Sequence, residues 1–289
     1  MINIKKLFYV FLIAILVVGL SGLSVYLIDM IDQDSPFVTT TTTSTSIPGS
    51  TSTTISSDSS VITTTSNLIS IDSEILIKMS LSNVMITTIY EHCYTEDNCI
   101  ILGSEQGSGT IIDHHDGGCM PPIGYAPPVC IDPWFDILTN FHVISNPEIE
   151  ANSVYYTVRN AQGMLFSAVY SKGSSEFDLA ILQSTGELTN SDIVDLNLEP
   201  QSIMIGSMVY AVGSPNQTQS VLSQGTFTSL YALNSYSYDV LQHTATLSEG
   251  SSGGALYNEF GEFLGINTFM NELGYYAIPR SVILLFLDS

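Results

Sequence analysis

The stretch Gly250-Ser251-Ser252-Gly253-Gly254 places a serine inside a tight, glycine-rich turn. A serine hydroxyl is a weak nucleophile at neutral pH, so it needs a neighbouring base to take its proton. Upstream, His142 follows an apolar run and Asp178 precedes another. The chain therefore contains, in this order, a candidate base, a candidate orienting carboxylate and a candidate nucleophile.

The order His142, Asp178, Ser252 is that of the chymotrypsin-type triad. In such a triad His142 takes the proton of Ser252 and later donates it to the leaving amine, while Asp178 fixes the tautomer of His142. The turn at Gly250 can aim the backbone N–H groups of Gly250 and Ser252 at the developing oxyanion. Loss of one such donor costs about 3 kcal/mol.

Strand signals dominate the chain after residue 83. Eleven short segments are rich in β-branched and aromatic residues and are separated by turns containing Gly, Pro, Asn or Ser. One short amphipathic helix is predicted before them, over residues 72–79, with Asp72 or Ser73 as its cap. This pattern predicts an all-β domain, and about 220 residues suit two six-stranded barrels.

These segments resemble the HtrA (Deg) family of trypsin-like serine proteases. The matching segments are Gly107–Ile112, Ile137–Ile144, Phe177–Leu182, Val209–Pro215, Leu222–Ser229, Leu241–Gly254, Gly261–Thr268 and Tyr276–Pro279. The resemblance implies a chymotrypsin/trypsin-like double β-barrel, endopeptidase activity, the triad His142, Asp178 and Ser252, and an oxyanion hole at Gly250 and Ser252.

Three departures from the family pattern stand out. Ser251 occupies a position where Asn is common, and Thr244 one where an acid is usual, next to a second histidine, His243. The chain ends about ten residues after Ala277-Ile278-Pro279, so we expect no C-terminal PDZ domain here. A homotrimer, which is typical of the family, is one expected assembly.

By analogy with related folds, Thr246 and Leu247 are expected to wall the pocket for the residue before the cut bond. Ile266, Asn267 and Thr268 are expected to pair with the substrate backbone as an added strand. Unless Glu249 turns inward, no acid stands where it would select Lys or Arg, so we expect small or medium apolar residues there. Backbone pairing tolerates many sequences, which favours unfolded polypeptides as substrates.

An uncharged apolar run of 22 residues, Leu7–Ile28, is long enough to cross a bilayer. Lys5 and Lys6 precede it and acidic residues follow it, so the positive-inside rule keeps residues 1–6 in the cytoplasm. We expect a single-pass signal anchor in the cell membrane with the catalytic domain outside the cytoplasm. A cleaved signal peptide is the alternative.

Residues 29–69 are expected to form a disordered linker between the anchor and a protease domain at 70–289. Between residues 39 and 66, 21 of 28 residues are Ser or Thr, a composition that cannot bury enough apolar surface to fold. The linker would hold the protease away from the membrane. A Thr-rich adhesive stalk is the alternative interpretation.

Four cysteines, an even number, indicate disulfides in an exported protein. We expect neighbours to pair, Cys93 with Cys99 and Cys119 with Cys130. A zinc site using His114, His115 and Cys119 is the alternative, but the spacing matches no common zinc pattern. We therefore expect neither a metal ion nor another cofactor.

The segment after the anchor has 28 acidic and four basic residues, a net charge of −24. This charge argues against nucleic acid as a partner. The sequence thus predicts a membrane-anchored serine endopeptidase. A catalytically silent peptide-binding or adhesion module is the alternative from another class, and a protease that cleaves its own stalk is a third interpretation.

Overall fold

The computed structural model describes residues 71–289 apart from 96–97, 121–128, 186–190 and 234–235. The expected membrane anchor and the whole of the expected linker lie outside these residues. Within the part that is described, no helix is both long and apolar enough to cross a bilayer.

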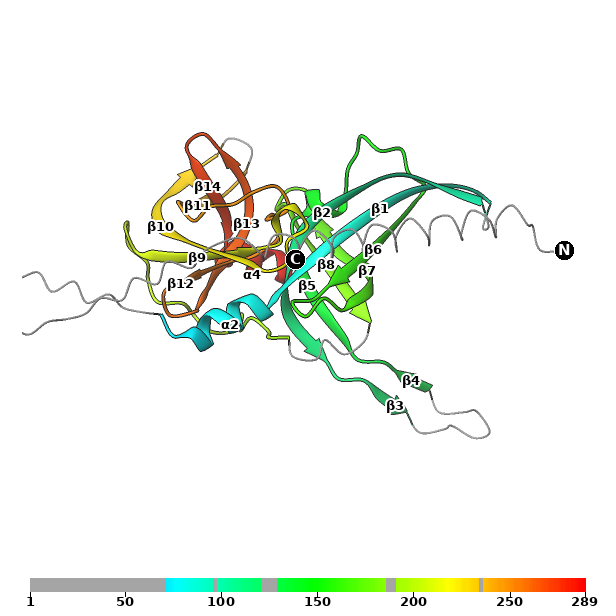
Figure 1. The fold of residues 1–289 in the computed structure, drawn as a ribbon, viewed down its shortest axis with the longest axis horizontal. Helices are drawn as coiled ribbons and strands as arrows, with labels where there is room; N and C mark the ends of the chain where they lie inside the picture. The colour runs from blue at the N-terminus through cyan, green and yellow to red at the C-terminus, as the bar shows by residue number, and fades with distance from the viewer. Residues whose placement is uncertain (1–70, 96–97, 121–128, 186–190, 234–235) are drawn as a thin grey trace, which may run out of the picture. The chain divides into compact units, whose positions relative to one another are not determined.

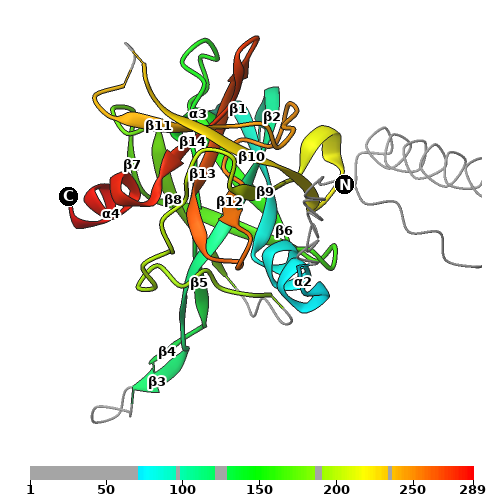
Figure 2. The same ribbon diagram turned by 90° about the vertical axis from the view of Figure 1, so that its left-hand side faces the viewer.

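The N-terminal barrel is closed by six antiparallel strands in the order β1-β2-β5-β8-β7-β6 (Figure 1). Its strands are β1 (Asn83–Thr95), β2 (Asn98–His115), β5 (Trp134–Thr139), β6 (Ser153–Arg159), β7 (Leu165–Ser174) and β8 (Leu179–Thr185). A small hairpin of β3 (Gly118–Met120) and β4 (Val129–Ile131) is inserted between β2 and β5 and projects from the barrel (Figure 2).

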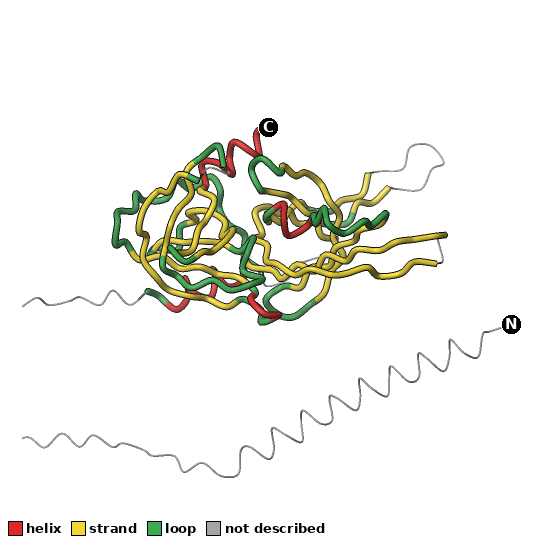
Figure 3. Tube along the Cα trace, turned by 90° about the horizontal axis from the view of Figure 1, so that it is seen from above, coloured by secondary structure: helices red, strands yellow, loops and turns green. Residues whose placement is uncertain are grey.

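The C-terminal barrel is also closed by six antiparallel strands, in the order β10-β11-β14-β13-β12-β9. They are β9 (Met208–Gly213), β10 (Val221–Ala232), β11 (Asp239–His243), β12 (Ala255–Asn258), β13 (Phe263–Asn271) and β14 (Gly274–Pro279). Two closed barrels of six strands confirm the fold class predicted from the sequence. Strands make up most of the described chain, and the helices are short (Figure 3).

Within the described ranges, short helical segments accompany the barrels: α2 (Ser73–Leu81), α3 (Phe141–Ile144), the 3₁₀ turn η1 (Pro215–Gln217) and α4 (Arg280–Asp288). The expected helix at 72–79 is α2, and the side chain of Asp72 caps it by accepting from the N–H of Glu74 at 3.0 Å. α4 was not predicted from the sequence.

The candidate site lies where the two barrels meet. The alternation of side chains along the inner strands explains how the barrels pack against each other. In β8, Ala180 and Leu182 fill the N-terminal barrel, while Leu179 and Ile181 face a second core between the barrels. The same strand therefore buries both faces, which accounts for its uninterrupted apolar run. β9 repeats this arrangement in the C-terminal barrel, and α4 adds Phe286 to the shared core.

Strand structure continues into the described part of the segment between β2 and β5. β2 continues to His115, and β3 pairs with β4 with Cys119 opposite Cys130. β1 and β2 likewise extend beyond the predicted strands as a long hairpin with Cys93 opposite Cys99. These extensions were not predicted, because their sequences are polar or contain glycine and carry no strand signal of their own. They form strands because the neighbouring strand supplies their hydrogen-bond partners.

Phe286 allows the shared core to be tested, because its side chain is fully buried whereas that of its neighbour Leu285 is 63% exposed. We expect Phe286→Ala to lower the free energy of unfolding by about 3–5 kcal/mol, through lost burial and a residual cavity. Leu285→Ala should change it by less than about 0.5 kcal/mol. Urea denaturation followed by circular dichroism measures both, and equal effects would contradict the core assignment.

Candidate active site

His142 and Asp178 come together at the junction of the two barrels. Nδ1 of His142 lies 2.9 Å from Oδ2 of Asp178, and the His142 backbone N–H donates to Oδ1 at 3.1 Å. Asp178 precedes β8 in the left-handed region, with φ of 51°, and its carbonyl accepts from Asn140 Nδ2 at 3.0 Å. The surrounding contacts therefore hold a sparsely populated backbone conformation that aims the carboxylate at His142.

Two further hydroxyls reach the same carboxylate. Thr268 Oγ1 donates to Asp178 Oδ2 at 2.8 Å, and the phenol of Tyr236 donates to it at 3.3 Å. Burial, and next the charge of Asp178, raise the pKa of Tyr236 to about 12, which keeps its hydroxyl protonated as a donor. Tyr236 was missed from the sequence, because nothing in its spacing ties a tyrosine between β10 and β11 to Asp178.

The hydroxyl of Ser252 points to the strand rather than to the imidazole. Its Oγ donates to the Thr268 carbonyl at 2.7 Å, and no hydrogen bond joins it to His142. Rotation about the Cα–Cβ bond moves a serine Oγ between staggered positions. Contacts of this kind are often long in unliganded sites and form when substrate arrives. The structure thus holds the hydroxyl of the candidate nucleophile on Thr268, while Ser252 and His142 line the same cleft.

The turn before Ser252 leaves two backbone donors available. Among the described residues, the N–H groups of Gly250 and Ser252 have no acceptor, whereas Ser251 N–H donates to the Ser248 carbonyl at 2.9 Å. Gly250 has φ of 93°, a conformation that favours glycine. The carbonyl of Glu249 accepts from Asn216 N–H at 3.1 Å. Both donors expected for an oxyanion hole are therefore unpaired.

Gly253, directly after Ser252, also needs to be glycine. Its φ is 88°, and a Cβ there would collide with the Ser108 carbonyl oxygen and the Thr139 hydroxyl. The N-terminal barrel thus packs against the back of the nucleophile turn at backbone distance.

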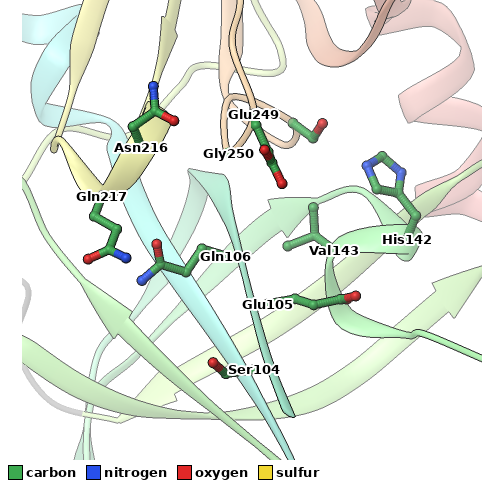
Figure 4. Close-up of a pocket in the computed structure, with 10 residues that line it drawn as sticks. Ser104, Glu105, Gln106, His142, Val143, Asn216, Gln217, Glu249 and Gly250 are labelled. Atoms are coloured by element: carbon green, nitrogen blue, oxygen red, sulfur yellow. The ribbon is translucent and has the colours of Figure 1, made fainter. Parts of the chain in front are cut away.

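A cleft of about 660 Å³ opens beside His142 and Ser252 (Figure 4). It is lined by Ser104, Glu105, Gln106, His142, Val143, Asn216, Gln217, Glu249, Gly250 and Ser252. Two polar groups of wall residues, 104–106 and 216–217, were not predicted from the sequence as part of the site. Residues 104–106 directly precede the Gly107–Ile112 motif, and residues 216–217 directly follow the Val209–Pro215 motif. This adjacency to recognised motifs is the sequence signal that could have identified them.

The five residues expected to contact substrate are placed differently from one another. Thr246 is exposed, but Leu247 is buried in the C-terminal barrel. Ile266 is fully buried between the barrels, and Asn267 is buried with Nδ2 donating to the carbonyls of Val212 and Ala255. None of the five lines the cleft.

His243 is buried in β11 and does not line the cleft. Burial lowers the pKa of His243 to about 4, so it is neutral near pH 7. Of these two histidines, the one that contacts Asp178 is His142, as the sequence motifs indicated.

Both expected disulfides are present, Cys93–Cys99 and Cys119–Cys130. Cys119 is therefore unavailable to the alternative zinc site.

A different set of metal-ligand types lies at the base of the β3–β4 hairpin. Nε2 of His115 is 3.0 Å from Asp136 Oδ2 and 3.6 Å from Asp113 Oδ2. These atoms are close enough to hold a divalent cation. They also form ion pairs whenever His115 is protonated, which accounts for their proximity without a metal.

The family model of the trypsin-like peptidase domain matches residues 107–266, just over half of the chain. The chain belongs to the trypsin-like peptidase family. The matched range contains His142, Asp178 and Ser252. It begins in β2 and ends in β13, so it spans parts of both barrels.

Individual relatives confirm the resemblance to HtrA (Deg) proteases. The serine endoprotease DegS of Escherichia coli K12 is 34% identical over 137 residues, 46% of this chain and 36% of DegS. The mitochondrial serine protease HTRA2 of Drosophila grimshawi is 30% identical over 159 residues, 53% of this chain and 36% of HTRA2. The match thus spans about a third of the length of these curated relatives.

A solved structure agrees. The crystal structure of the serine endoprotease from Yersinia pestis superimposes with a TM-score of 0.51 and 26% identity, covering 74% of this chain and 64% of that one. The double barrel and the family assignment therefore rest on sequence and on structure.

In this trypsin-like peptidase, Tyr236 can be tested as a positioning residue for Asp178. We expect Tyr236→Phe to lower kcat by about fivefold with little change in KM, because one hydrogen bond to a charged group is lost outside the substrate cleft. Steady-state kinetics on a peptide substrate measure the two constants. Tyr276→Phe is a matched control, because the Tyr276 hydroxyl contacts Gln242 and Asn271 instead. Equal losses in the two variants would contradict the role of Tyr236.

His243 makes the stability of the domain depend on pH. Its folded pKa of about 4 lies below the unfolded value of 6.5, so the unfolded chain binds more protons between these values. Stability should therefore fall by about 3 kcal/mol as the pH drops from 6.5 to 4. Urea denaturation at several pH values should show a smaller fall for His243→Gln. The same change at His92, on the β1–β2 hairpin, should leave the dependence intact.

Proposed function

We propose that this chain is a membrane-anchored, extracytoplasmic serine endopeptidase that cleaves unfolded or damaged polypeptides through an acyl-enzyme. The observation that carries the proposal is the joint geometry of the His142–Asp178 pair and the two unpaired N–H groups at Gly250 and Ser252. The His142–Asp178 pair supplies the general base for acyl transfer, and the two N–H groups supply the oxyanion hole.

In the first step Ser252 Oγ rotates from the Thr268 carbonyl to Nε2 of His142, exchanging one hydrogen bond for another. Oγ then attacks the substrate carbonyl carbon while its proton passes to Nε2. The former carbonyl oxygen becomes an oxyanion that accepts from Gly250 N–H and Ser252 N–H. Asp178 stays ionised and stabilises the imidazolium through Nδ1.

The tetrahedral intermediate collapses when His142 gives its proton to the leaving nitrogen, and the C–N bond breaks. The amine product departs and an ester joins Ser252 Oγ to the acyl half. Water then enters, His142 takes one of its protons, and hydroxide adds to the ester carbonyl. A second collapse returns the proton to Ser252 and releases the carboxylic acid.

The proposed preference before the cut bond is for small or medium apolar residues such as Val, Ala or Leu. The absence of an acid in Thr246–Ser248 supports it. Leu247 itself is buried in the C-terminal barrel, and the acid that lines the cleft is Glu249. Backbone pairing at Thr268 in β13 would accept the acyl half of an extended, unfolded chain, whereas Ile266 and Asn267 already use both edges of β13 within the barrel. Retention of the apolar segment 7–28 as an anchor and assembly into a homotrimer complete the proposal, and both rest on sequence and family likeness.

The test uses the full-length chain in detergent with a fluorophosphonate probe, which labels only activated serines, and with unfolded casein. We expect labelling and cleavage by the parent and neither by Ser252→Ala. Asp178→Asn should lower kcat by about 10⁴-fold, because His142 loses the partner that fixes its tautomer. Gel fluorescence and peptide release measure these activities.

The control is Ser248→Ala, which removes a hydroxyl four residues before the nucleophile and should label like the parent. A folded parent that neither labels nor cleaves between pH 5 and 8 would replace the proposal with the silent binding module. A product beginning within residues 39–70 would point to cleavage of the chain's own stalk.

A further inference from the structure

The active-site cleft continues beyond Gln106 and Gln217 into a second cavity. This cavity has a volume of about 210 Å³ and shares both glutamines with the cleft. Its other lining residues are Met85, Thr87, Thr157, Arg159 and Leu165. Gln106 and Gln217 lie on the side of the cleft away from His142 (Figure 4). One groove therefore leads from Ser252 past the glutamines to Arg159.

Arg159 is unusual among the cations of this acidic chain. The other basic residues in the described ranges all have partners: Lys78 pairs with Glu74, Lys172 donates to the Leu287 carbonyl, and Arg280 pairs with Glu199. The guanidinium of Arg159 has no ion pair or hydrogen bond with any residue in those ranges. An unpaired guanidinium at the end of a groove presents a planar fork of donors suited to a carboxylate.

The charge changes sign along the groove. Glu105 and Glu249 line the part next to the nucleophile, and Arg159 lines the far end. Tyr90 and Asn146 hold the Glu105 carboxylate through hydrogen bonds. A negative segment of substrate is therefore disfavoured next to the cut bond and favoured farther along.

The wall that joins the two cavities is fixed to the N-terminal barrel. Gln219 Nε2 donates to the Arg159 carbonyl at 2.9 Å, and Asn83 Nδ2 donates to Ser214 Oγ at 2.9 Å. Between these contacts Asn216 and Gln217 adopt left-handed conformations, with φ of 49° and 64°. Backbone strain of this kind persists only where surrounding contacts hold it.

Strand register gives the distance along the groove. Met85 in β1 pairs with Ser108 on one side and with Arg159 on the other, so Arg159 lies two strands from Ser108. Two strand spacings are about 10 Å, and an extended chain advances about 3.3 Å per residue. Since Ser108 N–H donates to the Ser252 carbonyl, Arg159 is about three residues from the cut bond.

We infer that Arg159 is a subsite for a carboxylate about three residues after the cut bond, on the leaving half of the substrate. The inference rests on the proposed function, which assigns the acyl half to β13 and so leaves this groove to the leaving half. The carboxylate belongs either to an Asp or Glu side chain or to the end of the chain. This enzyme then selects polypeptides that are acidic, or that end, shortly after the cleaved bond.

The test compares peptides that differ only at the third residue after the bond, which is Asp, Asn or Lys. With the full-length chain we expect kcat/KM for Asp to exceed that for Lys by about tenfold, and Arg159→Gln to abolish the preference. Arg159→Glu should favour Lys. Lys78→Gln, which removes a cation far from the groove, should keep the preference for Asp. Peptides that end at this position with a carboxylate or an amide distinguish a chain terminus from a side chain.

A binding measurement keeps this inference separate from the proposed function. Fluorescence anisotropy of the same labelled peptides on Ser252→Ala reports affinity without catalysis, and about tenfold tighter binding of the Asp peptide is expected. Cleavage without discrimination, or equal affinities for the Asp and Lys peptides, would overturn the subsite and leave the protease intact. Tight Asp binding by a chain that neither labels nor cleaves would overturn the protease and leave the subsite.

Discussion

The backbone N–H of Ser108 donates to the Ser252 carbonyl, and the Ser108 hydroxyl donates to the Gly250 carbonyl, each at 2.7 Å. Ser108 belongs to β2 of the N-terminal barrel, whereas the turn it holds belongs to the C-terminal barrel. The Ser108 side chain also accepts from the Ser214 N–H at 2.7 Å, and it is fully buried. In a buried site these bonds have no water to replace them, so the position of the nucleophile depends on the docking of the two barrels.

The same junction explains why the catalytic groups meet. His142 follows β5 and Asp178 precedes β8, two paired strands of one barrel, while Ser252 and Thr268 come from the other. Thr268 contacts both sets, because its hydroxyl donates to Asp178 of the other barrel and its carbonyl accepts from Ser252 of its own barrel. The strand that orients the base thereby also holds the nucleophile at rest. A substrate that displaces the Ser252 hydroxyl from Thr268 would complete the triad at the cost of about one hydrogen bond.

The sequence was sufficient for the double barrel, because short strands bounded by turn residues recur throughout the domain. It also indicated His142, Asp178 and Ser252, whose glycine-rich and apolar surroundings are local patterns. It did not indicate Tyr236 or Arg159, because their contacts depend on which strands become neighbours. Ile266 and Asn267 were expected to pair with the substrate backbone, but at these residues both edges of β13 are paired within the barrel and both side chains are buried. α4 was overlooked because its apolar residues pack against the core between the barrels, and that core forms only when both barrels are in place.

The two hairpins that project from the N-terminal barrel, β1–β2 and β3–β4, each carry a disulfide bond between residues that lie directly opposite each other in the ladder. A proteolytic cleft of the kind proposed here accepts a chain only as a single extended strand. A hairpin whose two arms are covalently joined cannot be drawn out in that form, and its arms stay attached to each other if the tip is cut. In a protease of the proposed kind, the cross-links would therefore protect these two hairpins from self-cleavage, and reducing conditions would shorten its working lifetime before they unfold its barrels.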